Sequence, residues 1–79
     1  MMYLHAGHDV MIMNQTIIAI LDRQILEQSE PTRQFFDRLR ALGRVHGSLH
    51  EAKSLIVTDD AVVCSPISAT TLSRRERPR

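Results

Sequence analysis

Residues 55–64 read Leu-Ile-Val-Thr-Asp-Asp-Ala-Val-Val-Cys and contain the clearest pair of strands in the chain. Two apolar runs rich in β-branched residues, 55–57 and 61–64, flank the turn-forming triplet 58–60. β-Branched residues pack well on a pleated sheet, whereas the short side chains of aspartate and threonine bond to the nearby backbone and favour turns. The pattern predicts a β-hairpin, ended by Ser65-Pro66. Turn formation also accounts for Asp59 and Asp60 better than a cation site does.

Upstream of the hairpin, the apolar runs 10–13 and 17–21 predict two further short strands. In the second run both alternating positions are apolar, with Ile18 and Ile20 on one face and Ile17, Ala19 and Leu21 on the other. A strand of this kind is covered on both faces. The main helix can cover one face, and the second cover is either the N-terminal segment of the same chain or another subunit.

Between residues 28 and 43 the apolar period changes to that of a helix, which we predict at about 31–42. Pro31 suits the first turn, since its missing N–H would be unpaired there, and Gly43 suits the left-handed residue that ends a helix. The spacing places an apolar stripe and a charged stripe on different faces. The apolar stripe is Phe35, Leu39 and Leu42 with Phe36 beside them, and the charged stripe is Arg33, Asp37, Arg40 and Arg44. Asp37 can pair with Arg33 or Arg40.

The remaining segments complete a small α+β fold. Residues 44–46 predict a short edge strand, residues 47–53 a flexible polar loop, and residues 68–72 a short helix. We expect one domain over residues 1–72, in which an antiparallel sheet of short strands and a C-terminal hairpin pack against one main helix. Residues 73–79 form a basic tail that we expect to be disordered, because it has little apolar surface to bury.

A chain of 79 residues, 43% apolar and 24% charged, has the balance of a globular protein and is too short for a multidomain enzyme. A core of this size is marginal by itself, which favours association between copies. Cys64 is the only cysteine, so no intramolecular disulfide can form, and we expect a reducing cytoplasm. The N-terminus lacks a signal-peptide pattern, and polar residues break the apolar run 10–26, so we expect no membrane span.

The formal net charge of +1 conceals an uneven distribution. The last seven residues hold four arginines and one glutamate, a net charge of +3, whereas residues 1–72 hold six basic and eight acidic groups, a net charge of −2. Phosphate binding depends on clustered positive charge rather than on the average. Any contact with nucleic acid must therefore come from a local stripe, such as that of the helix, or from the tail.

The residue pattern indicates neither catalysis nor metal binding. The chain has no glycine-rich phosphate loop and no nucleophile elbow, and Cys64 ends an apolar strand, where a buried and inert thiol is expected. Neither His5 with His8 nor His46 with His50 supplies a tetrahedral zinc site without further ligands. We therefore expect no enzyme activity, no cofactor and no metal, with the histidines on the surface or in subunit contacts.

Several segments carry a family resemblance: Met2-Tyr3-Leu4-His5, residues 17–22, Lys53-Ser54-Leu55-Ile56-Val57-Thr58-Asp59, Cys64-Ser65-Pro66-Ile67-Ser68 and Thr71-Leu72. Within residues 2–75 the chain resembles the small bacterial extracellular-matrix regulators of the Rem type, most closely the RemB branch. The resemblance implies a cytoplasmic DNA-binding transcriptional regulator of biofilm-matrix genes. It also implies a small α+β subunit in a symmetric homo-oligomer, since RemA members form rings around which DNA is proposed to wrap.

The sequence departs from the RemA branch at positions that the resemblance links to DNA. RemA carries an arginine pair in the loop before the hairpin, where this chain has His50-Glu51-Ala52-Lys53, and an arginine before the second strand, where this chain has Gln15-Thr16. The DNA-contacting residues therefore do not carry over one for one. The candidates for phosphate contacts without base reading are Arg33, Arg40, Arg44, Lys53, Arg74 and Arg75.

Two functions remain open from the sequence. The first is an oligomeric DNA-binding regulator whose weak basic contacts are multiplied by symmetry. The second is an oligomeric protein-interaction module with little DNA affinity, accessory to a DNA-binding paralogue, which the net charge of −2 and the missing arginine pair favour. For both functions the candidate oligomer interface is Ile17, Ile18 and Ile20.

Overall fold

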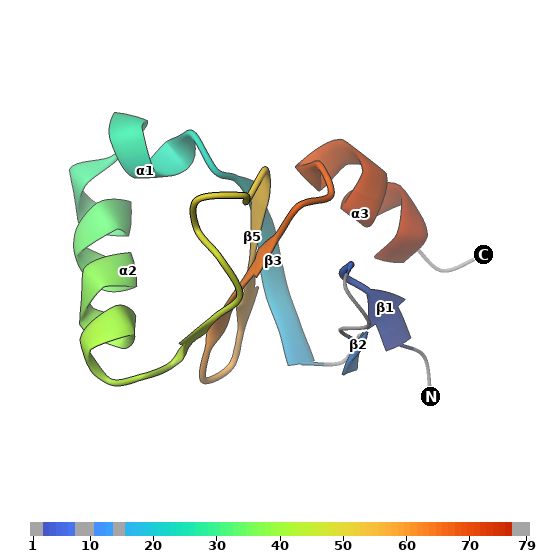
Figure 1. Cartoon of the computed structure of the whole chain (residues 1–79), viewed down its shortest axis with the longest axis horizontal. Helices are drawn as coiled ribbons and strands as arrows, with labels where there is room; N and C mark the ends of the chain where they lie inside the picture. Colours follow the sequence, from blue (N-terminus) through green and yellow to red (C-terminus); the bar gives the residue numbers. More distant parts are fainter. Residues whose placement is uncertain (1–2, 8–10, 14–15, 77–79) are drawn as a thin grey trace.

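The computed structural model describes residues 3–7, 11–13 and 16–76, which form three layers (Figure 1). Helices α1 (Ile25–Gln28) and α2 (Glu30–Ala41) cover one face of a four-stranded sheet. Helix α3 (Ala69–Glu76) and a two-stranded ribbon, β1 (Tyr3–His5) with β2 (Met11–Met13), cover the other face. The predicted α+β class is confirmed. Within the described residues, no helix is long and apolar enough to cross a membrane.

The four-stranded sheet is built around the predicted hairpin. Its strands lie in the order β3 (Ile17–Asp22), β5 (Ser54–Thr58), β6 (Val62–Ser65) and β4 (Val45–His46). β5 and β6 pair antiparallel, and the Thr58 N–H donates to the Ala61 carbonyl at 2.8 Å to close their turn. β3 is antiparallel to β5, but the edge strand β4 runs parallel to β6. The sheet is therefore mixed and not purely antiparallel as predicted. Strand β6 is antiparallel to its neighbour β5 and parallel to its other neighbour, β4.

Strand β3 contains a bulge that the alternating pattern does not reveal. Ile17 pairs with Thr58 and Ala19 with the adjacent Val57, so Ile18 is the extra residue at the register shift. A bulge interrupts the alternation of side chains between the two faces. Ile17 and Ile20 therefore pack against the same core cluster, whereas Ile18 is 68% exposed. The predicted pairing of Ile18 with Ile20 on one face is wrong for this reason.

Each face of the sheet has its own core. The ribbon-side core consists of Leu4, Ala6, Ile12, Ile56, Val63 and Leu72. The helix-side core consists of Leu26, Phe36, Ala52, Leu55, Val62 and Cys64. Neighbouring residues such as Leu55 and Ile56 enter opposite cores because successive side chains of a strand point to opposite faces. Of the two covers left open for the sheet's second face, the structure shows the N-terminal segment of the same chain, joined by α3.

Helix α2 begins and ends as predicted. Ser29 precedes it as the N-cap, with its Oγ accepting from the Thr32 N–H at 3.3 Å, and Pro31 lies in the first turn. Gly43 follows the helix with φ +73°, in the left-handed region. The predicted apolar stripe is wrong in part, since Phe36 is buried but Phe35 and Leu42 are exposed. Spacing defines several overlapping stripes, and the contact with the sheet selects the one containing Phe36 and Leu39.

Two helical segments extend beyond the predictions. The short helix α1 is not predicted, yet its Leu26 is part of the helix-side core. The short C-terminal helix is confirmed, and Ser68 caps it by accepting from the Thr71 N–H at 3.3 Å. This helix, α3, continues to Glu76, so residues 73–76 of the expected disordered tail are helical. Burial of Leu72 anchors the helix, and the basic residues Arg74 and Arg75 suit its C-terminal end. Residues 77–79 lie outside the described part.

The buried Ser65 links the segment after β1 and the segment before α3 to the sheet. β1 and β2 pair antiparallel, with Leu4 opposite Ile12, and both side chains are buried. Val10, included in the predicted strand, lies outside the described residues. Ser65, fully buried at the end of β6, donates from Oγ to the Ala6 carbonyl at 2.8 Å and accepts from the Ile67 N–H at 3.0 Å. This one hydroxyl therefore satisfies a donor and an acceptor from opposite ends of the chain.

We expect Ser65→Ala to lower the free energy of unfolding by about 1–3 kcal/mol, because it leaves the Ala6 carbonyl and the Ile67 N–H without their hydroxyl partner. Urea unfolding followed by circular dichroism measures the change. The control is Ser48→Ala in an exposed loop, which should shift the unfolding free energy by less than about 0.5 kcal/mol. Equal effects of the two substitutions would show that the buried hydroxyl does not secure the ribbon.

Candidate nucleic-acid interface

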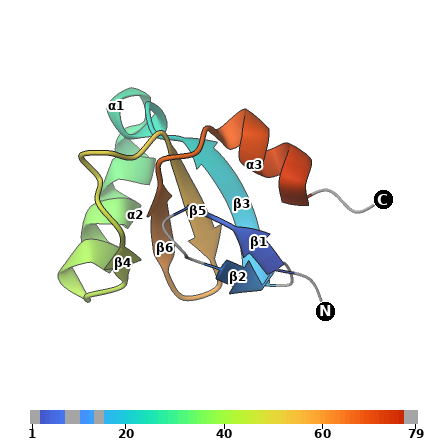
Figure 2. The same ribbon diagram turned by 45° about the vertical axis from the view of Figure 1, so that its right-hand side comes forward.

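The basic residues predicted to contact DNA lie on two separate surfaces. Arg33 and Arg40 project from α2, whereas Arg74 and Arg75 lie in the last turn of α3. Figure 2 shows these two helices on opposite sides of the sheet. The structure therefore does not bring the six predicted residues into one patch.

Arg33 and Arg40 line a pocket between α1, α2 and the loop that precedes β5. Its charged lining consists of Arg23, Arg33, Arg40, Glu27 and Asp37. Buried Leu26 and Phe36, with Leu49 from the loop, supply its apolar walls. The cavity measures about 100 Å³, which is room for about three water molecules. We call these three arginines and their pocket the arginine pocket.

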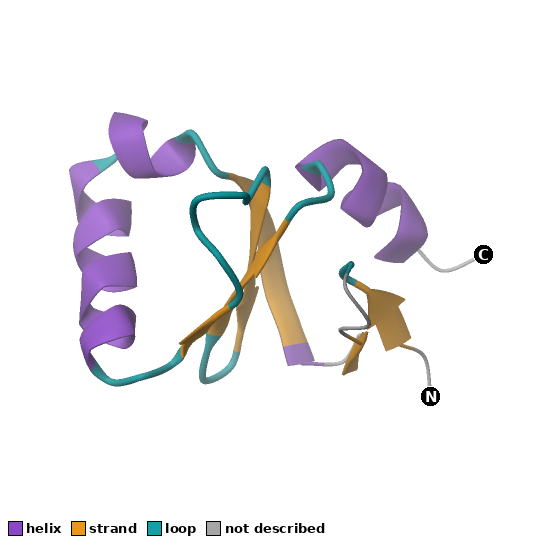
Figure 3. Cartoon of the chain, viewed as in Figure 1, coloured by secondary structure: helices purple, strands orange, loops and turns teal. Residues whose placement is uncertain are grey.

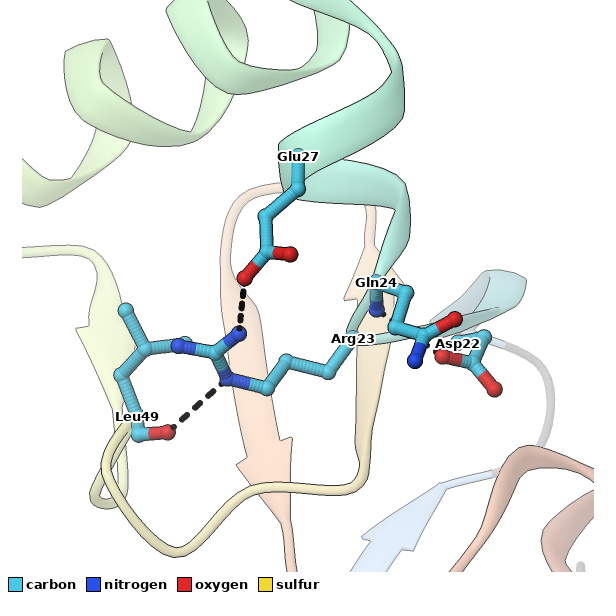
Figure 4. A network of polar contacts seen from close by, with 5 residues as sticks. All are labelled: Asp22, Arg23, Gln24, Glu27 and Leu49. Carbon is cyan, nitrogen blue, oxygen red and sulfur yellow. Dashed lines mark hydrogen bonds and ion pairs between the residues drawn. The ribbon is translucent and has the colours of Figure 1, made fainter.

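Arg23 connects the arginine pocket to the loop that carries Lys53, and Figure 4 shows its contacts with Leu49 of this loop and with Glu27 of α1. Its Nε donates to the Leu49 carbonyl at 3.4 Å, and its Nη1 lies 3.3 Å from Glu27 Oε2. Its backbone N–H donates to the Lys53 carbonyl at 3.1 Å. Sequence reasoning missed Arg23 as a functional candidate: its spacing of four residues from Glu27 indicates an ion pair only where the segment turns like a helix, and no helix is predicted there.

Lys53 has a fixed backbone and an exposed side chain. Its N–H donates to the Ser65 carbonyl at 2.8 Å, so the residue continues the pairing of β5 and β6. Figure 3 shows the long loop between β4 and β5, residues 47–53, which leads to it. Lys53 and Arg23 also line one open depression, together with Asp22 and Glu27. The loop thus presents Lys53 next to Arg23, in a mixed electrostatic environment.

Gly47 holds the beginning of this loop against β6. Its φ is +86°, and a Cβ built on it would lie 2.6 Å from the Cys64 carbonyl oxygen. No side chain fits so close to a backbone oxygen, so a glycine is required where the loop leaves the edge strand. The following residues Ser48, His50 and Glu51 are exposed.

The ion pairs on the helix side are exposed and weak. Arg33 Nε lies 3.9 Å from Asp37 Oδ2, and both side chains are 59% exposed, so the predicted pairing of Asp37 is confirmed for Arg33. Exposed pairs of this kind contribute about 0–1 kcal/mol. Among the described residues, Arg40 and Arg44 form no ion pair. The backbone of Arg44 is nevertheless used in the sheet, because its carbonyl accepts from the Val62 N–H.

The basic surface on α3 is smaller than the one on the helix side, with Arg74 and Arg75 as its described arginines. Arg75 Nη1 donates to the His5 carbonyl at 3.3 Å, which links the last turn of α3 to β1. Arg74 is exposed. Arg77 and Arg79, the other arginines of the tail, lie outside the described residues. One of the two described arginines is therefore already engaged in the fold.

The three predicted interface isoleucines differ in their surroundings. Ile17 and Ile20 are half-buried and pack against the ribbon-side core of their own chain. Ile18 projects from the bulge at the exposed edge of the sheet, because β3 is the outermost strand and pairs with β5 alone in that sheet. Tyr3 and Met11, on the ribbon, are also more than half exposed. Of the three isoleucines, Ile18 has the side chain that a partner can reach.

Cys64 has the surroundings of an unreactive thiol. It is buried in the helix-side core, and this confirms the predicted burial. Burial raises the pKa of the thiol, and the positive charges of Arg23 and Arg40 oppose this rise only in part. Within the described residues, no three His, Cys, Asp or Glu side chains gather as a metal would require. His8 and Asp9 lie outside the described part.

Comparison with protein families gives one match. The model of the RemA-like family, described as extracellular matrix regulatory protein A-like, matches residues 3–75. The match includes all the described strands and nearly all of α3. It confirms the resemblance at the level of the family and does not separate the RemB branch from the others. The search for individual curated relatives found no match.

We expect native Cys64 to react with a thiol reagent at least about a hundredfold more slowly than the urea-unfolded chain, because reaction requires opening of the core. The rate of disulfide exchange with a chromogenic reagent measures this at mildly alkaline pH. Since burial raises the folded pKa, the unfolded chain loses the thiol proton first, and the thiol therefore lowers stability as the pH rises through the ordinary pKa of cysteine. Equal labelling rates in the native and unfolded chains would contradict the buried position.

Proposed function

The chain belongs to the RemA-like family of extracellular matrix regulatory proteins, and on this premise we propose that it is a homo-oligomeric DNA-binding transcriptional regulator of matrix genes. The family match over residues 3–75 is the observation that carries the proposal. We assign it to the RemB branch and to the bacterial cytoplasm, as a non-enzyme. Regulation of the extracellular matrix follows from the family, while DNA binding and assembly are the proposed means.

The proposed contacts with DNA are made to phosphates. The six candidate residues are Arg33, Arg40, Arg44, Lys53, Arg74 and Arg75. Surface arginine and lysine side chains of this kind position a protein on the duplex without reading bases. The helix side supplies the larger share, because Arg23 brings the arginine pocket and Lys53 together there, whereas Arg75 is bonded to His5.

Assembly multiplies these few contacts. One subunit has a body of net charge −2 and two small basic surfaces on opposite sides. In a symmetric ring each subunit turns the same surface toward the duplex, so weak contacts add along the DNA. We assign Ile18 to the subunit contact, since it is a large apolar side chain exposed at the sheet edge. Ile17 and Ile20 pack against the ribbon-side core and so hold strand β3 in place beside this contact.

A second function is favoured by the acidic groups around the arginines. Glu27 and Asp37 line the arginine pocket, and exposed Glu51 stands close to Lys53 in the loop. Carboxylates at these positions weaken binding to phosphate. The alternative is an oligomeric interaction module that accompanies a DNA-binding paralogue and has little DNA affinity of its own.

For the first function, we expect the full-length protein to bind a fluorescent DNA duplex with an affinity that falls steeply between about 50 and 200 mM salt, because each phosphate contact releases counterions. Arg33→Gln combined with Arg40→Gln should reduce the salt slope by about 2 for each bound subunit. Arg74→Gln combined with Arg75→Gln should have a smaller effect. Fluorescence anisotropy measures all three proteins.

Light scattering on the same samples serves as the control, because a loss of assembly would also weaken DNA binding. An intact oligomer that binds no DNA at low salt would remove the first function and support the interaction module. If the two α3 substitutions weaken DNA binding more than the two α2 substitutions do, the DNA lies on the α3 side of the sheet.

Ile18→Lys should convert the oligomer to smaller species, because it puts a charge into a desolvated contact while leaving the core of the subunit intact. Light scattering gives the mass, and circular dichroism checks the fold. Leu42→Lys is the matched control, since Leu42 is 65% exposed on α2, close to the 68% of Ile18. An unchanged mass for Ile18→Lys, or an equal loss for both variants, would exclude the proposed contact.

A further inference from the structure

The arginine pocket has two walls that bring guanidinium groups together from distant segments. Arg33 and Arg40 are seven residues apart on α2, so they lie on one face about 10 Å apart along the helix axis. Arg23 comes from the other wall, between β3 and α1, where Leu49 and Glu27 hold its side chain. The opening between these groups is therefore bordered by positive charge on two sides.

The charges lining the pocket do not cancel. Three arginines face two carboxylates, which leaves a net charge of +1. Glu27 is bound to Arg23, and Asp37 is held loosely by Arg33, while Arg40 has no carboxylate partner among the described residues. The NH groups of Arg40 thus remain available to an acceptor from outside the chain. A guanidinium donates parallel hydrogen bonds that match the oxygens of a phosphate group.

The size and the walls of the pocket restrict what it can hold. A volume of about 100 Å³ accommodates a tetrahedral oxyanion and is well below the roughly 300–1,000 Å³ of pockets that enclose larger organic ligands. Buried Leu26 and Phe36 keep water from one side of the site, which strengthens the attraction between the arginines and an anion. The apolar surface is too small to select an aromatic or aliphatic ligand.

We propose that the arginine pocket binds a single phosphate group, with Arg40 as its principal contact and with Arg23 and Arg33 on either side. The group is either a free phosphate or a phosphate of the DNA backbone. The DNA source rests on the proposed function, whereas the free anion does not. The inference adds Arg23 to the predicted residues and assigns opposite effects to the arginines and the carboxylates of the pocket.

The test uses the full-length protein and inorganic phosphate at constant ionic strength. Isothermal titration calorimetry gives the affinity, and the NMR resonances of the arginine Nε–H groups report which side chains respond. We expect saturable binding that Arg40→Gln weakens about tenfold, since it removes a charged donor. Asp37→Asn should tighten binding about threefold, because it removes a nearby negative charge without a change of shape.

Arg38→Gln is the matched control. Arg38 lies in the same last turn of α2 as Arg40 but is not part of the pocket lining, so its substitution should leave the affinity unchanged. Absence of saturable binding, or equal weakening by Arg38→Gln and Arg40→Gln, would overturn the proposal. A weaker phosphate affinity in Asp37→Asn would overturn it as well, because removal of a negative charge should strengthen binding, whereas a general disturbance of α2 would weaken it.

A second titration, with a short DNA duplex, separates the two sources of phosphate. Competition between inorganic phosphate and the duplex supports a backbone phosphate in the pocket, and simultaneous binding supports a free anion. DNA binding without phosphate binding overturns the pocket and leaves the proposed function standing. Phosphate binding without DNA binding upholds the pocket and removes the proposed function.

Discussion

The hairpin of β5 and β6 is apolar on both faces, and this constraint organises the whole molecule. Leu55 and Ile56 are neighbours in the chain, yet both are almost fully buried, in different cores. Because a strand directs successive side chains to opposite faces, the chain has to cover the sheet twice. Helices α1 and α2 form one cover, and the ribbon with α3 forms the other. Ser65, at the end of the hairpin, bonds the second cover to the sheet.

The double cover also divides the surface chemistry. It places α2 and α3 on opposite sides of the sheet, so basic residues from the two helices cannot act on one phosphate cluster. Their concentration on the helix side depends on Arg23, which joins α1, the arginine pocket and the loop of Lys53. The second cover removes the need for a neighbouring subunit over β3. The subunit contact that we propose therefore lies at the sheet edge, where the bulge exposes Ile18.

This arrangement is consistent with the proposed regulation of matrix genes by an oligomer. In the proposed oligomer, a subunit with few basic residues and a slightly acidic body would gain affinity for DNA by repetition rather than by one strong patch. The arginine pocket makes the proposed contact more specific, since it would receive one phosphate at a defined position in each subunit. Glu27 and Asp37 limit the strength of that contact and would keep it sensitive to salt.

Local pattern in the sequence determined the hairpin, the limits of α2, the edge strand, the short C-terminal helix and the buried Cys64, because turn residues, caps and apolar periods act over a few neighbouring positions. It also determined the family, through motifs spread along the chain. Tertiary structure alone decided the bulge at Ile18, the burial of Phe36 instead of Phe35, and the extension of α3 past residue 72. It likewise placed Arg23 and Arg40 along one pocket, because the packing of α1 against α2 and the position of the loop at Leu49 are set by tertiary contacts and by no single spacing along the chain.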